Sequence, residues 1–305
     1  YTIQKSFMHL HKIFYALLGI MGKPMAKNLV KAGEEVTVFD FNQPAIDELV
    51  KLGAKSAKNG KELAQAAEVV FTMVQNSPNV ESALFDKDGI AEGLVAGNTV
   101  IDMSSINPLA SQDFAKRLAK LNVGFLDAPV SGGEPKAIDG TIAFMVGGEK
   151  KLFDKFKDVL GIMGGSVTYV GPVGAGNTTK LTNQIIVALN IAAVSEGFSL
   201  AEKAGLDPQL VFNAIHTGLA GSTVMDAKVP MIINRNFDPG FRVDLHIKDL
   251  QNALDTSHSL NIGLPLTAEA MEILQVVKND GNGSDDHSAI AKFYEKINNL
   301  TIQKK

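Results

Sequence analysis

The sequence has no cysteine and no tryptophan among its 305 residues. Without cysteine the chain cannot form a disulfide, use a thiolate nucleophile, or hold zinc or an iron–sulfur cluster through sulfur. An excess of charge of one sign is also missing, because the formal net charge is only -4. This balance gives no electrostatic reason to expect nucleic acid or an anionic membrane as a partner. We therefore expect a small-molecule substrate and a cytoplasmic location.

Long hydrophobic runs are missing as well, since no uninterrupted apolar stretch reaches the roughly 18 residues of a membrane-spanning helix. The apolar segment Ile13 to Met21 is short, but basic residues precede it, so a secretory signal peptide is an alternative. Against that alternative, Gly22-Lys23-Pro24 continues into a helical pattern where a cleavage site would need small residues. We interpret residues 1–11 as a loose extension and expect no membrane partner.

Residues 12–173 alternate short runs of β-branched and aromatic residues with helical patterns. Such alternation predicts an α/β domain with a mostly parallel, doubly wound sheet and helices on both faces. The predicted strands are Ile13–Leu18, Val36–Phe39, Val69–Val74, Val100–Asp102, Phe125–Leu126, Ile142–Val146 and Val167–Val170.

Residues 174–305 have a different character, because a long helical pattern over Asn177–Ala204 is followed by no convincing strand. We predict an all-α domain for this part of the chain. Glycine, proline and aspartate mark breaks between its helices. The predicted breaks are Gly205–Pro208, Gly218–Ser222, Asp238–Gly240 and Gly281–Ser284.

The stretch FYALLGIMGKPM, from Phe14 to Met25, is similar to the dinucleotide-binding pattern G-x-G-x-x-G between a strand and a helix. Gly19 and Gly22 fill the second and third places, where glycine permits close approach to a pyrophosphate and close helix–strand packing. Leu17 stands in the first place and costs about 1 to 3 kcal/mol if the tight backbone geometry is kept. Two glycines alone also fit an ordinary strand–helix turn.

Asp40 ends the next predicted strand, about 20 residues further on, where an acidic side chain accepts hydrogen bonds from the adenosine ribose. A carboxylate there also repels the 2′-phosphate of NADP(H). The alternative is a turn or helix cap ahead of Asn42 and Pro44.

The segment Ser131-Gly132-Gly133 follows another predicted strand. Its hydroxyl and consecutive backbone N–H groups suit a carboxylate or phosphate, although the same composition also fits a plain loop. Serines in Asp-Met-Ser-Ser-Ile-Asn-Pro, at 104 and 105, can be read as helix caps ahead of Pro108.

Lys180, Asn183 and Gln184 share one face of the long helix because they stand at i, i+3 and i+4. A lysine that is desolvated on an apolar face loses its proton more easily, which suits a general acid–base group. The alternative is a snorkelling lysine whose ammonium reaches water. Lys248-Asp249 can be read as an exposed pair on a helix. The six histidines form no recognised ligand set, so we predict no metal.

Together these motifs resemble the β-hydroxyacid dehydrogenase family. The likeness runs from about residue 12 to the end of the sequence. It implies a Rossmann domain over 12–173, a helical substrate and oligomerisation domain over 174–305, an active site in the cleft between them, and a homo-oligomer. The segments that carry it are LGIMGKPMAKNL, DMSSINPLAS, DAPVSGGEPKAIDGT, GAGNTTKLTNQIIVALNIAA, LAGSTVMDAK and GFRVDLHIKDLQNALDTSH.

The resemblance also implies roles for individual residues. Lys180 is the expected catalytic residue, and a small hydroxy or oxo acid is the expected substrate. The expected substrate-binding residues are Ser131, Gly132, Gly133 and Asn183. The expected cofactor is NAD(H) or NADP(H), bound by Leu18, Gly19, Ile20, Met21, Gly22, Asp40, Val74, Gln75, Asn79, Ser105 and Lys248.

Within the family, the motifs are most similar to the branch that reduces tartronate semialdehyde (2-hydroxy-3-oxopropanoate) to glycerate. The implied reaction is hydride transfer to the aldehyde carbon while Lys180 protonates the developing alkoxide. Gln184 supports this branch, whereas Gln75 stands where related chains often have proline. A dehydrogenase for 3-hydroxyisobutyrate or another small β-hydroxy acid is an alternative. A cofactor-impaired binding or regulatory relative is a second alternative, because of Leu17.

Overall fold

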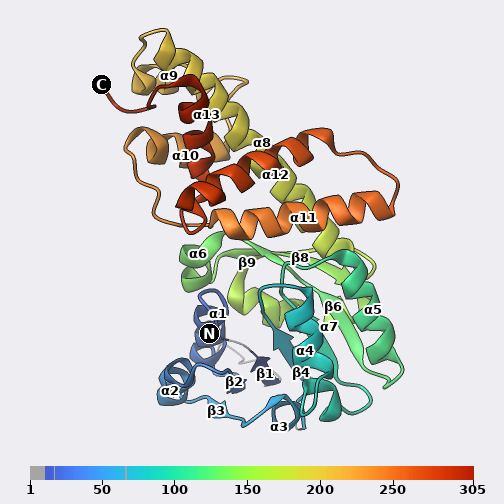
Figure 1. The fold of residues 1–305 in the computed structure, drawn as a ribbon. Helices are drawn as coiled ribbons and strands as arrows, with labels where there is room; N and C mark the ends of the chain where they lie inside the picture. Colours follow the sequence, from blue (N-terminus) through green and yellow to red (C-terminus); the bar gives the residue numbers. More distant parts are fainter. Residues whose placement is uncertain (1–10, 17, 66) are drawn as a thin grey trace, which may run out of the picture. The chain divides into compact units, whose positions relative to one another are not determined.

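The computed structural model describes residues 11–16, 18–65 and 67–305. The first ten residues of the predicted extension, and Leu17 of the predicted nucleotide loop, lie outside the described residues. The chain forms two compact units, Tyr1–Lys180 and Leu181–Lys305. Figure 1 shows the elements of both. The domain boundary expected at residue 174 stays a prediction.

The first unit is built on a nine-stranded sheet with the order β3-β2-β1-β4-β5-β6-β8-β7, and β9 pairs with β8. Its pairs are parallel except where β8 meets β6 and β7. The strands are β1 (Lys12–Ala16), β2 (Glu35–Phe39), β3 (Lys55–Ser56), β4 (Val69–Thr72), β5 (Thr99–Asp102), β6 (Gly124–Asp127), β7 (Val130–Ser131), β8 (Ile142–Gly148) and β9 (Gly164–Gly171).

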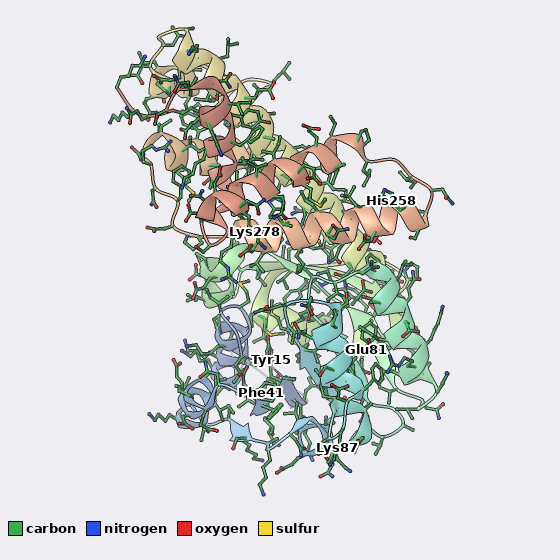
Figure 2. All side chains as sticks on the ribbon, viewed as in Figure 1. Tyr15, Phe41, Glu81, Lys87, His258 and Lys278 are labelled. Carbon is green, nitrogen blue, oxygen red and sulfur yellow. The ribbon has the colours of Figure 1, made fainter. Side chains whose placement is uncertain are left out.

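Both faces of this sheet are covered by helices, as the alternation of side chains in β1 shows. Ile13 and Tyr15 belong to one hydrophobic core, whereas Phe14 and Ala16 belong to the other, because successive side chains of a strand point to opposite faces. Tyr15 (Figure 2) is completely buried. The predicted doubly wound arrangement is confirmed.

The first core is closed by α1 (Gly22–Lys31), α6 (Gly133–Asp139) and α7 (Lys150–Met163). The second core is closed by α3 (Gly60–Ala64), α4 (Ser77–Phe85) and α5 (Pro108–Ala119). A further helix, α2 (Gln43–Lys51), follows β2, and its buried residues belong to the first core.

Glycines follow the ends of the first two helices. Gly33 follows α1 with φ +91°, and Gly53 follows α2 with φ +111°. Glycine adopts this left-handed conformation without the steric penalty that a Cβ would bring. These turns return the chain to the next strand, so that the carboxyl ends of β1 and β2 meet at one edge of the sheet.

The second unit is helical. It contains α8 (Ala175–Lys203) from Leu181 onward, followed by α9 (Pro208–Ile215), α10 (Thr223–Ile233), α11 (Val243–Ser259), α12 (Pro265–Val277) and α13 (Ile290–Asn298). The four predicted breaks each separate two of these α-helices, although Pro208 is already the first residue of α9 and Gly281 lies inside a short π-helix, Lys278–Asn282. A further break separates α11 from α12, at Asn261 and Gly263, two turn residues that the prediction does not use.

Among the described helices, α8 is the one that is long and apolar enough to cross a membrane by length and composition. Half of its apolar window is buried inside the structure. Ala188 and Ile191 of α8 pack into a hydrophobic core with Leu250 and Leu274. Fully burying such aliphatic side chains contributes about 1.5 to 3 kcal/mol each, so this face of α8 is a core face of the second unit.

Candidate active site

The loop between β1 and α1 carries the glycines of the predicted nucleotide pattern. Lys23 N–H donates to the carbonyl of Gly19 (3.0 Å), which closes the turn into α1. Within the described residues no side chain caps the start of α1. Lys23 N–H is already bonded and Pro24 has no N–H, so Gly22 carries the first N–H of α1 that no described residue accepts and that an anion could use. A Cβ at Gly19 would meet nothing within 4 Å, so no described side chain fills the space beside this backbone.

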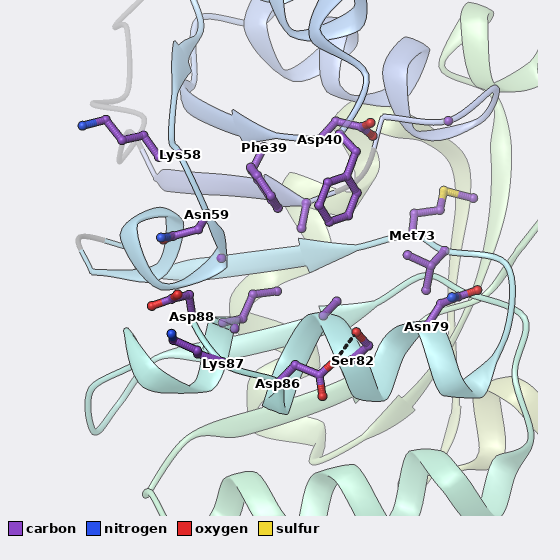
Figure 3. Close-up of a pocket in the computed structure, with 18 of the residues that line it drawn as sticks. Phe39, Asp40, Lys58, Asn59, Met73, Asn79, Ser82, Asp86, Lys87 and Asp88 are labelled. Atoms are coloured by element: carbon purple, nitrogen blue, oxygen red, sulfur yellow. Dashed lines mark hydrogen bonds between the residues drawn. The ribbon is translucent and has the colours of Figure 1, made fainter.

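A pocket of about 710 Å³ opens beside this loop (Figure 3). Its size is within the range of cofactor and ligand sites, about 300 to 1,000 Å³. Five predicted cofactor residues line it: Gly19, Asp40, Val74, Gln75 and Asn79. They come from three segments that follow β1, β2 and β4, because the carboxyl ends of parallel strands share one edge of the sheet.

Asp40 binds the backbone of the β1–α1 loop and of the turn that leads into α2. Its carboxylate accepts hydrogen bonds from Leu18 N–H and from Asn42 N–H (2.6 Å for the second). The turn-forming alternative for Asp40 is therefore present, while Asn42 is the residue at the N-cap of α2. Because Asp40 also lines the pocket, the same side chain shapes the loop and faces the space beside it.

Other residues of the pocket were not expected from the sequence. Lys58 to Gly60 and Asp86 to Ile90 form another part of its wall, with Ser82 donating to Asp86 (2.5 Å, Figure 3). A Cβ at Gly60 would lie 2.9 Å from Ile90 N, so glycine is needed where the two segments meet. The sequence marks these two segments as turns, through Asn59-Gly60 and Asp88-Gly89, but it does not mark them as part of a pocket.

A buried carboxyl organises the loops that follow β4 and β5. Asp102 Oδ1 accepts the hydroxyls of Thr72 (2.8 Å) and Ser104 (2.6 Å). Ser104 Oγ in turn accepts Val74 N–H at 2.9 Å. Burial raises the pKa of Asp102 to about 7. The reading of the two serines as helix caps is wrong, because Asn107 caps α5 by accepting Leu109 N–H. Ser105 itself is half-buried.

The predicted carboxylate loop lies between β7 and α6. Ser131 ends β7, and the next two residues have positive φ, +142° for Gly132 and +74° for Gly133. A side chain at either position would be strained, so the two glycines are required by the backbone. The segment is thus a tight glycine turn with a half-buried serine hydroxyl at its start.

The start of α8 is fixed by a second buried carboxyl. Asp127 accepts Gly174 N–H at 2.8 Å and Asn177 N–H at 2.7 Å. Burial raises the pKa of Asp127 to about 6, and hydrogen bonds from the backbone keep it from rising further. The contact is close, since a Cβ at Gly147 would lie 2.5 Å from Asp127 Oδ1 and one at Gly176 2.4 Å from the Asp127 carbonyl oxygen.

Lys180 lies in the second turn of α8 and is only 6% exposed. This burial argues against the alternative in which its ammonium extends into open water. In the second unit Asn183 donates to Gln184 (2.8 Å), and Gln184 donates to the carboxylate of Asp249 (2.7 Å). Lys248 pairs with the same carboxylate at 3.0 Å. The reading of Lys248-Asp249 as an exposed pair is wrong, because Asp249 is 1% exposed.

Comparison with known proteins now identifies the chain. A family model described as the NAD binding domain of 6-phosphogluconate dehydrogenase matches residues 12–171. A second model, described as NAD-binding of NADP-dependent 3-hydroxyisobutyrate dehydrogenase, matches residues 174–294. The 2-hydroxy-3-oxopropionate reductase of Escherichia coli (strain K12) is 41% identical over 94% of this chain and 98% of its own length. The chain belongs to the β-hydroxyacid dehydrogenase family.

Two further relatives support the family. The mitochondrial 3-hydroxyisobutyrate dehydrogenase of Bos taurus is 32% identical over 90% of this chain and 84% of its own length. The crystallised 3-hydroxyisobutyrate dehydrogenase of Mycobacterium tuberculosis has a TM-score of 0.86 and 31% identity, covering 93% of this chain and 98% of its own. The protein is accordingly an NAD(P)-dependent oxidoreductase.

The residues present fit the nicotinamide cofactor of this family. The space at Gly19 is open enough for a pyrophosphate to approach the backbone, and Gly22 has an N–H to offer it. Asp40 lines the same pocket, and a carboxylate after this strand fits an adenosine ribose. The lining of the pocket therefore fits NAD(H) or NADP(H).

Proposed function

We propose that the protein reduces tartronate semialdehyde to glycerate, with NADH as reductant and Lys180 as the proton donor. The observation that carries the proposal is the bonding around Asp127 and Asn177. Asp127 ends β6, which leads through Pro129 into the loop of Ser131, and its carboxylate holds the helix of Lys180. Asn177 ties the same helix to the segment after Ser105.

We infer the chemistry from the residue types in the segments that Asp127 and Asn177 connect. A bound reduced nicotinamide supplies the hydride that the aldehyde carbon accepts. Lys180, as an ammonium, donates a proton to the oxygen of that carbonyl, so that a hydroxyl is formed; in the reverse direction its neutral amine accepts the hydroxyl proton. The hydroxyl of Ser131 and the N–H groups of Gly132 and Gly133 bind the substrate carboxylate. Burial of Lys180 limits competition from water for these interactions.

For the cofactor we propose NADH over NADPH. Asp40 presents a carboxylate at the ribose end of the pocket, where a 2′-phosphate would be repelled. Asp86 and Asp88 add two negative charges to the lining of the same pocket, and Lys58 and Lys87 add two positive charges. The carboxylate of Asp40 therefore leaves the lining with an excess of negative charge. Leu18, Ile20, Met21, Gly22, Ser105 and Lys248, which do not line this pocket, stay predicted cofactor residues, and Asn183 stays a predicted substrate residue.

The first test replaces the proton donor. Lys180→Ala should lower kcat by about 100-fold or more, because a general acid contributes that much or more to such a reaction. The affinity for NADH, measured by fluorescence titration, should be nearly unchanged. Lys203→Ala is the matched control, since Lys203 is an exposed lysine at the far end of the same helix. A Lys180→Ala enzyme with wild-type turnover would contradict the assignment.

A second candidate substrate is 3-hydroxyisobutyrate, which the printed names of the bovine and mycobacterial relatives favour. Steady-state turnover should therefore be measured on tartronate semialdehyde and 3-hydroxyisobutyrate side by side, with each nicotinamide cofactor. A higher kcat/KM for tartronate semialdehyde supports the proposal, and the opposite order replaces it. If NADH does not bind at all, the cofactor-impaired relative suggested by Leu17 is the correct reading.

We propose further that the protein is a cytoplasmic homo-oligomer with no nucleic acid or membrane partner. This part of the proposal rests on the family resemblance and on the balanced charge of the sequence. Size-exclusion chromatography with light scattering decides the oligomeric state.

A further inference from the structure

Asn177 is completely buried, and its side chain links two segments distant in sequence. Its Oδ1 accepts Ile106 N–H at 3.0 Å, and its Nδ2 donates to Ser111 Oγ at 3.1 Å. Its own backbone N–H donates to Asp127. A buried amide that is hydrogen-bonded through both its oxygen and its nitrogen holds its neighbours in one arrangement, because a shift leaves a polar group unpaired.

Asn177 connects two segments that carry predicted site residues, Ser105 and Lys180. Ile106 directly follows Ser105 in the loop after β5, and Ser111 lies in α5. Lys180 stands three residues after Asn177, on the adjacent turn of the same helix. A rotation of the first turn of α8 about its axis would therefore change where the side chain of Lys180 leaves the helix.

We propose that Asn177 is a positioning residue of the reaction: it locks the first turn of α8 to the loop of Ser105 and so sets the place of the Lys180 ammonium. This inference rests on the proposed role of Lys180 as the proton donor. Asn177 does not itself touch the reacting atoms. Its contribution is the alignment of the acid with the carbonyl oxygen, which is sensitive to displacements of about 1 Å.

The main test is Asn177→Ala. This variant loses the two side-chain links but keeps the backbone N–H that Asp127 binds, so the start of α8 remains capped. We expect kcat to fall by about 100-fold while the affinity for NADH changes little. The primary isotope effect with 4-deuterated NADH should rise, because a misplaced acid makes the chemical step more rate-limiting.

Two further variants separate positioning from folding. Ser111→Ala removes only one of the two anchors, so it should lower kcat in the same direction by a smaller factor, even if Asn177→Ala proves unstable. Ser195→Ala is the matched control. Ser195 is also a completely buried polar residue of α8, but among the described residues its hydroxyl bonds inside the helix, to the Ile191 carbonyl at 2.7 Å. Its loss should leave kcat unchanged.

A double-mutant cycle decides whether Asn177 acts through Lys180. In a Lys180→Ala background, Asn177→Ala should change kcat by less than about twofold, because the group it positions is gone. The inference is overturned if the full loss of kcat persists in that background, or if folded Asn177→Ala enzyme has wild-type kcat and an unchanged isotope effect. Wild-type turnover by Lys180→Ala alone would instead overturn the proposed function.

Discussion

Asp102 and Asp127 occupy opposite positions on the neighbouring strands β5 and β6, yet their carboxyls make different bonds. Asp102 receives two side-chain hydroxyls on Oδ1, and its Oδ2 has no hydrogen-bond partner in the described part of the chain. Asp127 uses both oxygens for backbone N–H groups at the start of α8. The bonds of Asp127 therefore need two accepting oxygens, whereas those of Asp102 need one.

Replacing Asp102 and Asp127 in turn by asparagine should give the largest difference in the free energy of unfolding. Asp127→Asn places an amide NH₂ against a backbone N–H, and a buried group left unpaired in this way costs about 1 to 3 kcal/mol. Asp102→Asn keeps the accepting oxygen for Thr72 and Ser104. We therefore expect urea unfolding at pH 7 to show a clearly lower free energy of unfolding for Asp127→Asn, and a much smaller change for Asp102→Asn. Equal losses in the two variants would remove the distinction.

The pH dependence of stability sharpens the same comparison. The folded-state pKa of Asp102, about 7, exceeds its ordinary value of 3.8, so the folded protein binds more protons than the unfolded chain between these values. Stability from this group is thus complete below pH 3.8 and is lost as the pH rises through 7.

Asp102→Asn should abolish that loss. Between pH 6 and 7.5 the wild type should lose about 1 kcal/mol more than the variant, since one pKa unit corresponds to about 1.4 kcal/mol. Thermal unfolding of both proteins across this range is the measurement. Because Asp127 has a pKa of about 6, most of its own contribution is already lost below this window. Parallel stability curves for the two proteins would show that Asp102 does not titrate here.

The smallest effect on stability is expected at Asp40, a third carboxyl at a strand end, which is half-buried. Asp40→Asn should change the free energy of unfolding by no more than about 0.5 kcal/mol, because water reaches the site. It should raise KM for NADH about tenfold, because the ribose loses a hydrogen bond to a charged group, which is worth about 1.5 kcal/mol. It should lower KM for NADPH, because the charge that repels the 2′-phosphate is removed. If the preference between NADH and NADPH does not change, Asp40 stabilises the loop and does not contact the cofactor.

Much of the fold could be predicted from the sequence because its signals are local and periodic. Strands such as β1 and β4 have short apolar runs, and α8 has a long helical pattern. The strands β3 and β7 have two residues each, which is too short for any period to appear.

The site was predicted in part for the same reason. Gly19, Asp40 and Gln75 follow separate strands, and the geometry of a parallel sheet brings those strand ends together. The bonds of the Asn177 side chain could not be predicted, because one of its partners, Ile106, lies 71 residues earlier in the chain. The role of the Asp102 side chain could not be predicted, because its burial and its hydrogen-bond partners exist only in the folded chain.

The glycines at 147 and 176 limit how this enzyme can be redesigned. Even a single methyl group at either position would come within 2.5 Å of an Asp127 oxygen, so a library that varies them would yield mostly defective members. Variation is better directed at the exposed residues of α6, such as Lys136, where side chains have room to change. The close packing around Asp127 is thus also a limit on directed evolution.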